Sequence, residues 1–380
     1  MEVAENPRER GVGVRAIVSL VFLSAFCWAE SDAVYPGHHW EKGDPAKLGW
    51  STEKLDKARA YLANLPPASV LLVDRGRVVA EWGDPAKRSK IASVRKSFLS
   101  SLYGIYADKG RIDLDKTLAE LGIDDRPALT DREKKASIRM LLESRSGIYH
   151  GYVSGTPGMR AVTPARGSHM PGSFWYYNNW DFNALGTIFE KVTGTGLADA
   201  LRDSIARPIG MEDYRVEDLS HYSSPADAPE FSQSTHQSYP IRLSARDMAR
   251  FGYLFLRKGN WNGKQVVPSA WVAESTKAQA RVGKDRFTEA GADNPWNGEG
   301  YAYCWWVDGF GVPAKSFNAR GAMAKYIVIF PELELVLVYL NHAEPPDDTS
   351  KLTVEDFAKL PAPTANQIEQ FFKLVLQARQ

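Results

Sequence analysis

The sequence predicts an α/β protein of the α+β type, in which an antiparallel sheet is flanked by N- and C-terminal helices and carries a mostly helical insertion domain. Three observations support this prediction: a hairpin pattern near the start of the chain, a helical pattern with long loops in the middle, and further strand patterns near the end. Strands from both ends of the chain then have to meet in one sheet.

The first elements are a helix and a hairpin. Ser51 is a typical N-cap for a helix that extends to about Leu65. Two short strands follow over residues 69–73 and 77–82, because apolar, β-branched residues flank the turn signal at 74–76.

The rest of the chain contains helices, a long loop and strands. A helix begins near Ser93 and ends at Gly110, a favourable C-cap. Residues 146–176 are rich in glycine, proline and serine, and a loop of this length usually lines or covers a site. The other expected helices lie over 137–142, 181–192, 244–258 and 364–378, and the other expected strands over 301–307, 316–320, 325–330 and 334–340.

These elements predict four parts. Residues 1–29 form a signal peptide, residues 30–47 an extended lead-in, residues 48–115 together with 300–380 the sheet domain, and residues 116–299 the helical domain.

The signal peptide is predicted from arginines that precede an apolar run over residues 16–29, followed by the polar Glu30. The run is shorter than the roughly 20 residues that a membrane-spanning helix needs. Cleavage near Ala29 is therefore favoured, with an uncleaved tether as the alternative. The mature protein is expected to be exported, either periplasmic or secreted, without a stable membrane span.

Composition excludes several classes of partner and site. A net charge of +1 over 380 residues argues against nucleic acid or an anionic membrane as the main partner. Cys27 lies in the predicted signal, so Cys304 stands alone and neither a disulfide nor a cysteine metal cluster is expected. None of the seven histidines has metal-ligand spacing on a helix, and we expect no metal and no cofactor. The oligomeric state stays open.

The segment Ser93-x-x-Lys96 is the first station with catalytic potential. A three-residue spacing on a helix places the hydroxyl and the amine on one face. An amine in a dry pocket can lose its proton near neutral pH and then accept the proton of a serine hydroxyl. The spacing is weak alone, because Ser51 and Lys54 repeat it where an N-cap explains the serine.

The second station follows the long loop, where a tyrosine and an asparagine two residues apart can reach one pocket. Two registers fit: Tyr177 with Asn179, or Tyr176 with Asn178. A phenol can relay a proton if nearby cations lower its pKa, and an asparagine amide can bond both the lysine and a substrate carbonyl.

The third station is the strand that contains Arg320, Gly321 and Ala322. A glycine in a strand lets a substrate backbone lie close, and a neighbouring N–H can help to stabilise an oxyanion. Arg320 is a further candidate for substrate binding, although adjacent residues of a strand face opposite sides of the sheet. Lys325, a little further on, is expected to be a surface charge.

At these three stations the chain resembles the serine β-lactamase and penicillin-binding protein superfamily, in its class C β-lactamase-like branch of esterases and amidases. The resemblance extends over about residues 45–342. A Leu185-Gly186 pair matches the family spacing from Asn179 and so favours the register of Tyr177. Further family-like segments lie at 109–115, 140–148, 244–252 and 262–264.

The resemblance implies a β-lactamase/transpeptidase-like fold and a two-step acyl transfer. Ser93 would be the nucleophile, Lys96 and Tyr177 a coupled general base and acid, and Asn179 a substrate-binding group. The N–H groups of Ser93 and Ala322 would form the oxyanion hole. Here Ala319-Arg320-Gly321 replaces the family's usual Lys-Thr-Gly, so the cation that binds the carboxylate of β-lactams is missing at its usual position.

Two classes of function follow. The favoured one is a serine hydrolase that cleaves an ester or amide bond of a small molecule, on a substrate without that carboxylate; a β-lactamase or a D-Ala-D-Ala carboxypeptidase is the alternative. The other is a catalytically silent, penicillin-binding-like binding protein. An intact Ser93, Lys96 and Tyr177 favours the enzyme.

Overall fold

The computed structural model describes the chain except for residues 2–32, 284–287 and 290–298, and Val34–Gln380 forms one compact unit. The predicted signal peptide lies outside the described residues. None of the helices that the structure describes is long and apolar enough to cross a membrane.

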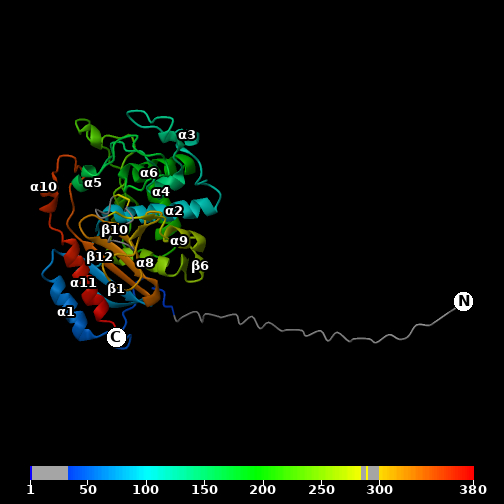
Figure 1. Cartoon of the computed structure of the whole chain (residues 1–380). Helices are drawn as coiled ribbons and strands as arrows, with labels where there is room; N and C mark the ends of the chain where they lie inside the picture. The colour runs from blue at the N-terminus through cyan, green and yellow to red at the C-terminus, as the bar shows by residue number, and fades with distance from the viewer. Residues whose placement is uncertain (2–32, 284–287, 290–298) are drawn as a thin grey trace. The chain divides into compact units, whose positions relative to one another are not determined.

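An antiparallel sheet that includes β1, β10 and β12 forms the centre of this unit (Figure 1). It has eight strands in the order β2-β1-β12-β11-β10-β9-β8-β7. This confirms the predicted fold class. The strands are β1 (Ala68–Asp74), β2 (Arg77–Trp82), β7 (Ala280–Arg281), β8 (Gly300–Tyr301), β9 (Trp306–Val307), β10 (Phe317–Gly321), β11 (Lys325–Phe330) and β12 (Leu335–Asn341). Because β12 pairs with both β1 and β11, the two ends of the chain meet at the middle of the sheet.

Alternating residues of the central strands face two separate apolar layers. In β1, Leu71 and Val73 pack into one buried cluster, whereas Val70 and Leu72 pack into the other. Buried on both sides, these strands read as continuous apolar runs rather than as a polar and apolar alternation.

Helices cover both faces of the sheet. α1 (Thr52–Leu62) and α11 (Ala365–Gln377) pack side by side on the face that carries Val70 and Leu72 (Figure 1). α8 (Ala245–Leu256) packs against β1, β11 and β12 on the opposite face.

Most other helices lie between β2 and β8 in the chain. They are α2 (Arg95–Asp108), α3 (Leu118–Leu121), α4 (Ile138–Leu142), α5 (Pro157–Ala161), α6 (Asn179–Thr193), α7 (Leu197–Leu201) and α9 (Ser269–Ser275), and α10 (Val354–Ala358) follows β12. Since α8 lies within residues 116–299 and yet packs on the sheet, the helical range also contributes to the sheet layers. The domain boundaries stay a prediction.

One expected strand is wrong. Residues 301–307 form a tight reversal between β8 and β9 rather than one strand: the N–H of Ala302 donates to the carbonyl of Trp305 at 2.9 Å. Cys304 makes the reversal possible with a left-handed backbone, φ 61°. A non-glycine residue rarely adopts this conformation, so no residue type at this position indicated a turn.

Candidate active site

A short turn before α2 presents Ser93. The 3₁₀ turn Ala92–Val94 leads directly into α2, and Ala92 has a left-handed backbone, φ 46°. Such a conformation is costly for alanine and persists only where the surroundings hold it. Ser93 is half-buried, whereas nearly all of α2 behind it is buried.

Three side chains surround the amine of Lys96. Its Nζ lies 2.9 Å from Ser93 Oγ, 2.6 Å from Tyr177 OH and 2.6 Å from Asn179 Oδ1. Lys96, Tyr177 and Asn179 are all at least nine-tenths buried. The structure therefore brings four of the predicted site residues together.

Asn179 fixes the direction of these hydrogen bonds. Its Nδ2 donates to the carbonyl of Ser154 at 2.8 Å, so Oδ1 faces Lys96 and can only accept. A neutral amine has two N–H groups and one lone pair. With one N–H committed to Asn179, the lone pair can receive a proton from the hydroxyl of Ser93 or Tyr177.

Burial sets the protonation states of the pair. Desolvation, assisted by the nearby charge of Arg95, lowers the pKa of Lys96 well below its usual value. Desolvation also raises the pKa of Tyr177, although its hydrogen bond to Ser93 and the charge of Arg95 oppose that rise. The site thus favours a neutral amine as the proton acceptor and a neutral phenol as a donor.

The alternative register does not reach the amine. Tyr176 OH donates to the carbonyl of Met159 at 3.0 Å and bonds Thr163. Asn178 is the N-cap of α6, and its Nδ2 donates to the carbonyl of Ile148 at 2.6 Å. Of the two registers, Tyr177 with Asn179 is the one whose side chains lie within hydrogen-bond distance of Lys96.

Gly321 and Ala322 lie beside the nucleophile turn. A Cβ on Gly321 would come within 2.5 Å of the carbonyl oxygen of Ile91. We expected this glycine to let a substrate approach, but the close approach is made by the protein's own backbone just before Ser93. Ala322 lines the same cleft as Ser93.

Arg320 and Lys325 are held by other groups. Arg320 Nη2 donates to the carbonyl of Asp308 at 2.9 Å, its Nη1 lies 3.6 Å from Glu299, and it does not line the cleft of Ser93. The surface position expected for Lys325 is wrong: the residue is fully buried and donates to the carbonyls of Asn341 and Ala343. Burial lowers its pKa to about 8.

A C-terminal segment that the sequence did not single out completes the cleft. The cleft is lined, among others, by Ser93, Ser154, Asn179, Ser238, Thr349 and Phe357. Arg160 on α5 holds this segment by donating to the carbonyls of Thr349 at 3.0 Å and Leu352 at 3.1 Å.

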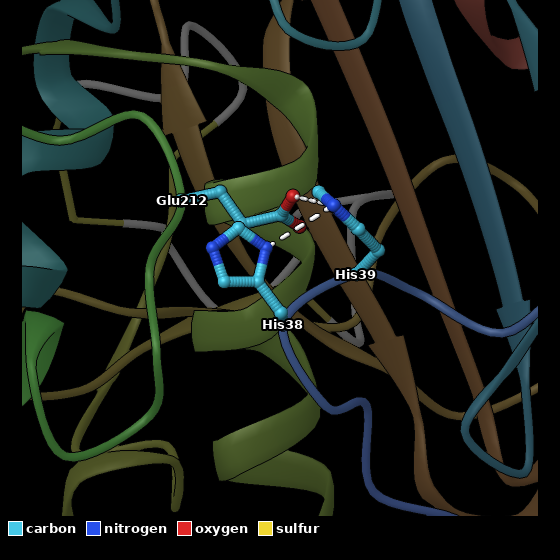
Figure 2. Close-up of side chains that lie close together, drawn as sticks. All are labelled: His38, His39 and Glu212. Atoms are coloured by element: carbon cyan, nitrogen blue, oxygen red, sulfur yellow. Dashed lines mark hydrogen bonds and ion pairs between the residues drawn. The ribbon is translucent and has the colours of Figure 1, made fainter.

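A second polar group lies away from this cleft. Figure 2 shows His38, His39 and Glu212 turned toward one another, with His39 Nδ1 2.7 Å from Glu212 Oε2. Three possible metal ligands meet here, which the sequence could not show because Glu212 is far away in the chain. Arg246 and Arg250 already pair with the same carboxylate at 3.1 and 3.2 Å. A cation would have to compete with both, so the group is best interpreted as an ion-pair anchor for the N-terminal segment.

Comparisons with known proteins show the family and the fold of the chain. A model of the Beta-lactamase family matches residues 56–358. The 6-aminohexanoate-dimer hydrolase of Paenarthrobacter ureafaciens is 23% identical over 338 residues, which is 80% of this chain and 81% of that protein. Penicillin-binding protein 4 of Amycolatopsis lactamdurans is 24% identical over 300 residues, 71% of this chain and 76% of that protein.

A solved structure from Bacillus anthracis, provisionally named a 6-aminohexanoate-dimer hydrolase, shares the fold. Its TM-score is 0.61 at 20% identity, and the match covers 89% of this chain and 86% of that one.

Proposed function

The chain belongs to the beta-lactamase family and is a serine hydrolase, and from this premise we propose that it cleaves an ester or amide bond of a small substrate through an acyl-enzyme on Ser93. The observation that carries the proposal is the amine of Lys96, which lies within hydrogen-bond distance of both the Ser93 and the Tyr177 hydroxyls.

In the first step, Ser93 Oγ attacks the carbonyl carbon while its proton passes to the neutral Lys96 amine. The oxyanion is stabilised by the N–H groups of Ser93 and Ala322. As the bond to the leaving group breaks, the proton passes from Lys96, directly or by way of the Tyr177 hydroxyl, to the departing alcohol or amine. This leaves the acyl group on Ser93.

In the second step, water attacks the acyl carbonyl and gives its proton to the same pair, which returns a proton to Ser93 Oγ. The products are a free acid and the regenerated serine. No group of the protein besides Lys96, Tyr177 and Ser93 needs to change protonation, because the proton that the leaving group takes up is replaced by the one that water gives up.

Two findings support an ester or amide over a β-lactam. Ala319 stands where the family usually has a lysine in the strand of Arg320 and Gly321, and Arg320 is held away from the cleft. A relative whose match covers 80% of this chain is named a 6-aminohexanoate-dimer hydrolase rather than a β-lactamase.

Covalent labelling tests the proposal. A fluorophosphonate probe should label the wild-type protein and not Ser93→Ala. Ser100→Ala is the matched control, because Ser100 lies on the same helix and its buried hydroxyl has no hydrogen-bond partner among the described residues. It should label like wild type. A wild-type protein that takes no label, although its thermal melting shows that it is folded, would overturn the acyl-enzyme.

A hydrolysis panel then ranks the substrates. We expect turnover of p-nitrophenyl esters and of a linear amide, with weaker turnover of nitrocefin and of a D-Ala-D-Ala peptide. Faster turnover of nitrocefin than of both the ester and the amide would instead favour a β-lactamase.

A further inference from the structure

We propose that Arg95 binds an anionic group of the substrate, so that the preferred ester or amide carries a carboxylate. This inference rests on the proposed function and adds to it the chemical class of the substrate. Arg95 lies inside the Ser93-x-x-Lys96 segment, two residues after the nucleophile, and lines the same cleft as Ser93.

Arg95 is a buried cation with few partners. Its side chain is 5% exposed, one guanidinium nitrogen donates to Asn183 Oδ1 at 3.3 Å, and the guanidinium lies 4.6 Å from the ring centre of Tyr239. Its Nε is buried and has no hydrogen-bond partner among the described residues. Within the part of the chain that the structure describes, no carboxylate oxygen lies within 4.0 Å of it.

Arg250 is a buried arginine outside the cleft, and its partners can be compared with those of Arg95. It is fully buried, pairs with Glu212 at 3.2 Å, and donates to the carbonyls of Ile209, Gly37 and His38. Burial of a charge is costly unless it is paired and hydrogen-bonded. The Nε of Arg250, like that of Arg95, has no hydrogen-bond partner among the described residues. The difference lies in the other nitrogens: those of Arg250 reach a carboxylate and three carbonyls, whereas those of Arg95 make one hydrogen bond, to Asn183.

Among the described residues that line the cleft, none offers Arg95 an unpaired negative charge. The acidic residue that lines it is Asp347, which pairs with Lys90 at 2.7 Å. Ser154 and Ser238 lie in the same lining but are neutral, and their hydroxyls bond each other at 2.8 Å. A substrate carboxylate would supply the missing charge-assisted partner.

Arg95 would then take the place of the family lysine that is missing at the third station. Ala319 stands where the family has a lysine, so a carboxylate has no partner there. The expectation from the sequence was a substrate without a carboxylate. Arg95 offers a cation from α2 instead of β10, and so favours a different placement of the anionic group.

A rival role is that Arg95 acts only on the neighbouring amine, because its charge helps to lower the pKa of Lys96. The two roles predict different results. Loss of a charge that tunes Lys96 slows all substrates alike, whereas loss of an anion contact slows only the substrates that carry the anion.

The test compares two esters of equal acyl length, p-nitrophenyl hydrogen glutarate and its methyl ester, which differ in the carboxylate. Wild type should prefer the charged ester by about tenfold or more in kcat/KM, the equivalent of one good ion contact. Arg95→Met should bring the ratio of the two kcat/KM values to about 1, and Arg95→Lys should keep part of the preference.

A ratio that Arg95→Met leaves unchanged, or a wild-type protein that shows no preference, would overturn the inference. Hydrolysis of the neutral ester by wild type keeps the proposed function separate, because that function fails only if neither ester is cleaved.

A second measurement does not depend on the folding of Arg95→Met. In wild type and in Arg95→Lys, butyrate should inhibit hydrolysis of the neutral ester competitively, and butyramide should inhibit it much less. Equal inhibition by the two compounds would contradict the anion contact.

Discussion

The proposed chemistry depends on the amine of Lys96. One of its three neighbours, Asn179 Oδ1, can only accept a hydrogen bond, and the other two are hydroxyls. An ammonium would donate to all three, but its burial without a carboxylate disfavours the charge. The amine is therefore prepared to take a proton before a substrate arrives.

The pH dependence of kcat/KM should follow the protonation of Lys96. Because a base must be unprotonated, activity should rise as the pH increases through the lowered pKa of Lys96 and then level off. The measurement is an ester kcat/KM profile from about pH 5 to about pH 10, the range around the ordinary histidine and lysine pKa values. Circular dichroism at each pH controls for unfolding. An activity that increases on acidification would contradict Lys96 as the base.

Removal of the side-chain hydroxyl should affect kcat/KM at Tyr177 but not at the adjacent Tyr176. Tyr177→Phe removes the phenol that contacts Lys96 and should lower kcat/KM by about 10²- to 10⁴-fold, as expected for loss of a general acid or base. Tyr176→Phe is the control, because its hydroxyl bonds Met159 and Thr163 instead. We expect kcat/KM of this variant to stay within a few fold of wild type. Equal losses in the two variants would remove Tyr177 from the proton path.

Part of the site was predictable at the level of single residues. The three-residue spacing of Ser93 and Lys96 follows from helix geometry, and the pair Tyr177 and Asn179 followed from a family spacing. The environment of Arg95 was not predictable, because a missing carboxylate partner is a property of several elements packed together.

Among the elements, long runs were predictable and short reversals were not. The expected strand at 325–330 matches β11 in full, because β-branched and aromatic residues follow one another without interruption from Tyr326 to Phe330. β8 and β9 were missed because their turn uses Cys304, a residue type without turn preference. The cleft-lining segment around Thr349 has no periodic pattern, and tertiary contacts such as the Arg160 bonds position it.

The contact between β10 and the nucleophile turn should be sensitive to one methyl group. In Gly321→Ala the new Cβ would lie 2.5 Å from the carbonyl oxygen of Ile91, so the turn that carries Ser93 has to shift. Overpacking of this kind costs about 1–3 kcal/mol of stability, and a shift of the nucleophile lowers kcat as well. Urea unfolding and ester kinetics measure the two effects.

Gly37→Ala is the control for Gly321→Ala, because it adds the same methyl group at a position outside β10. Nothing lies within 4 Å of a Cβ placed there, so both stability and kcat should stay near wild type. A Gly321→Ala protein with normal kcat would show that β10 does not position Ser93.

At the scale of the whole molecule, β12 joins the first and last parts of the chain. It pairs with β1 on one side and with β11 on the other. The helices α1 and α11 pack together on the sheet face that carries Val70 and Leu72. The N-terminal hairpin therefore cannot complete its sheet until the C-terminal strands arrive. The active-site turn shares this dependence, because Gly321 at the end of β10 packs against Ile91.

This arrangement predicts that a lesion in α11 reaches the active site only through global unfolding. Phe371 is fully buried against the sheet, and Phe371→Ala should cost about 3–5 kcal/mol, a large share of the roughly 5–15 kcal/mol that stabilises a domain. Lys373→Ala, on the same helix but part-exposed and paired with Glu369, should cost less than about 1 kcal/mol. In urea, ellipticity and ester hydrolysis should be lost at the same midpoint in both proteins, with the midpoint lowered in Phe371→Ala. Activity lost well before ellipticity in Phe371→Ala would mean that the helical region and the sheet unfold separately, against the cooperative role of β12.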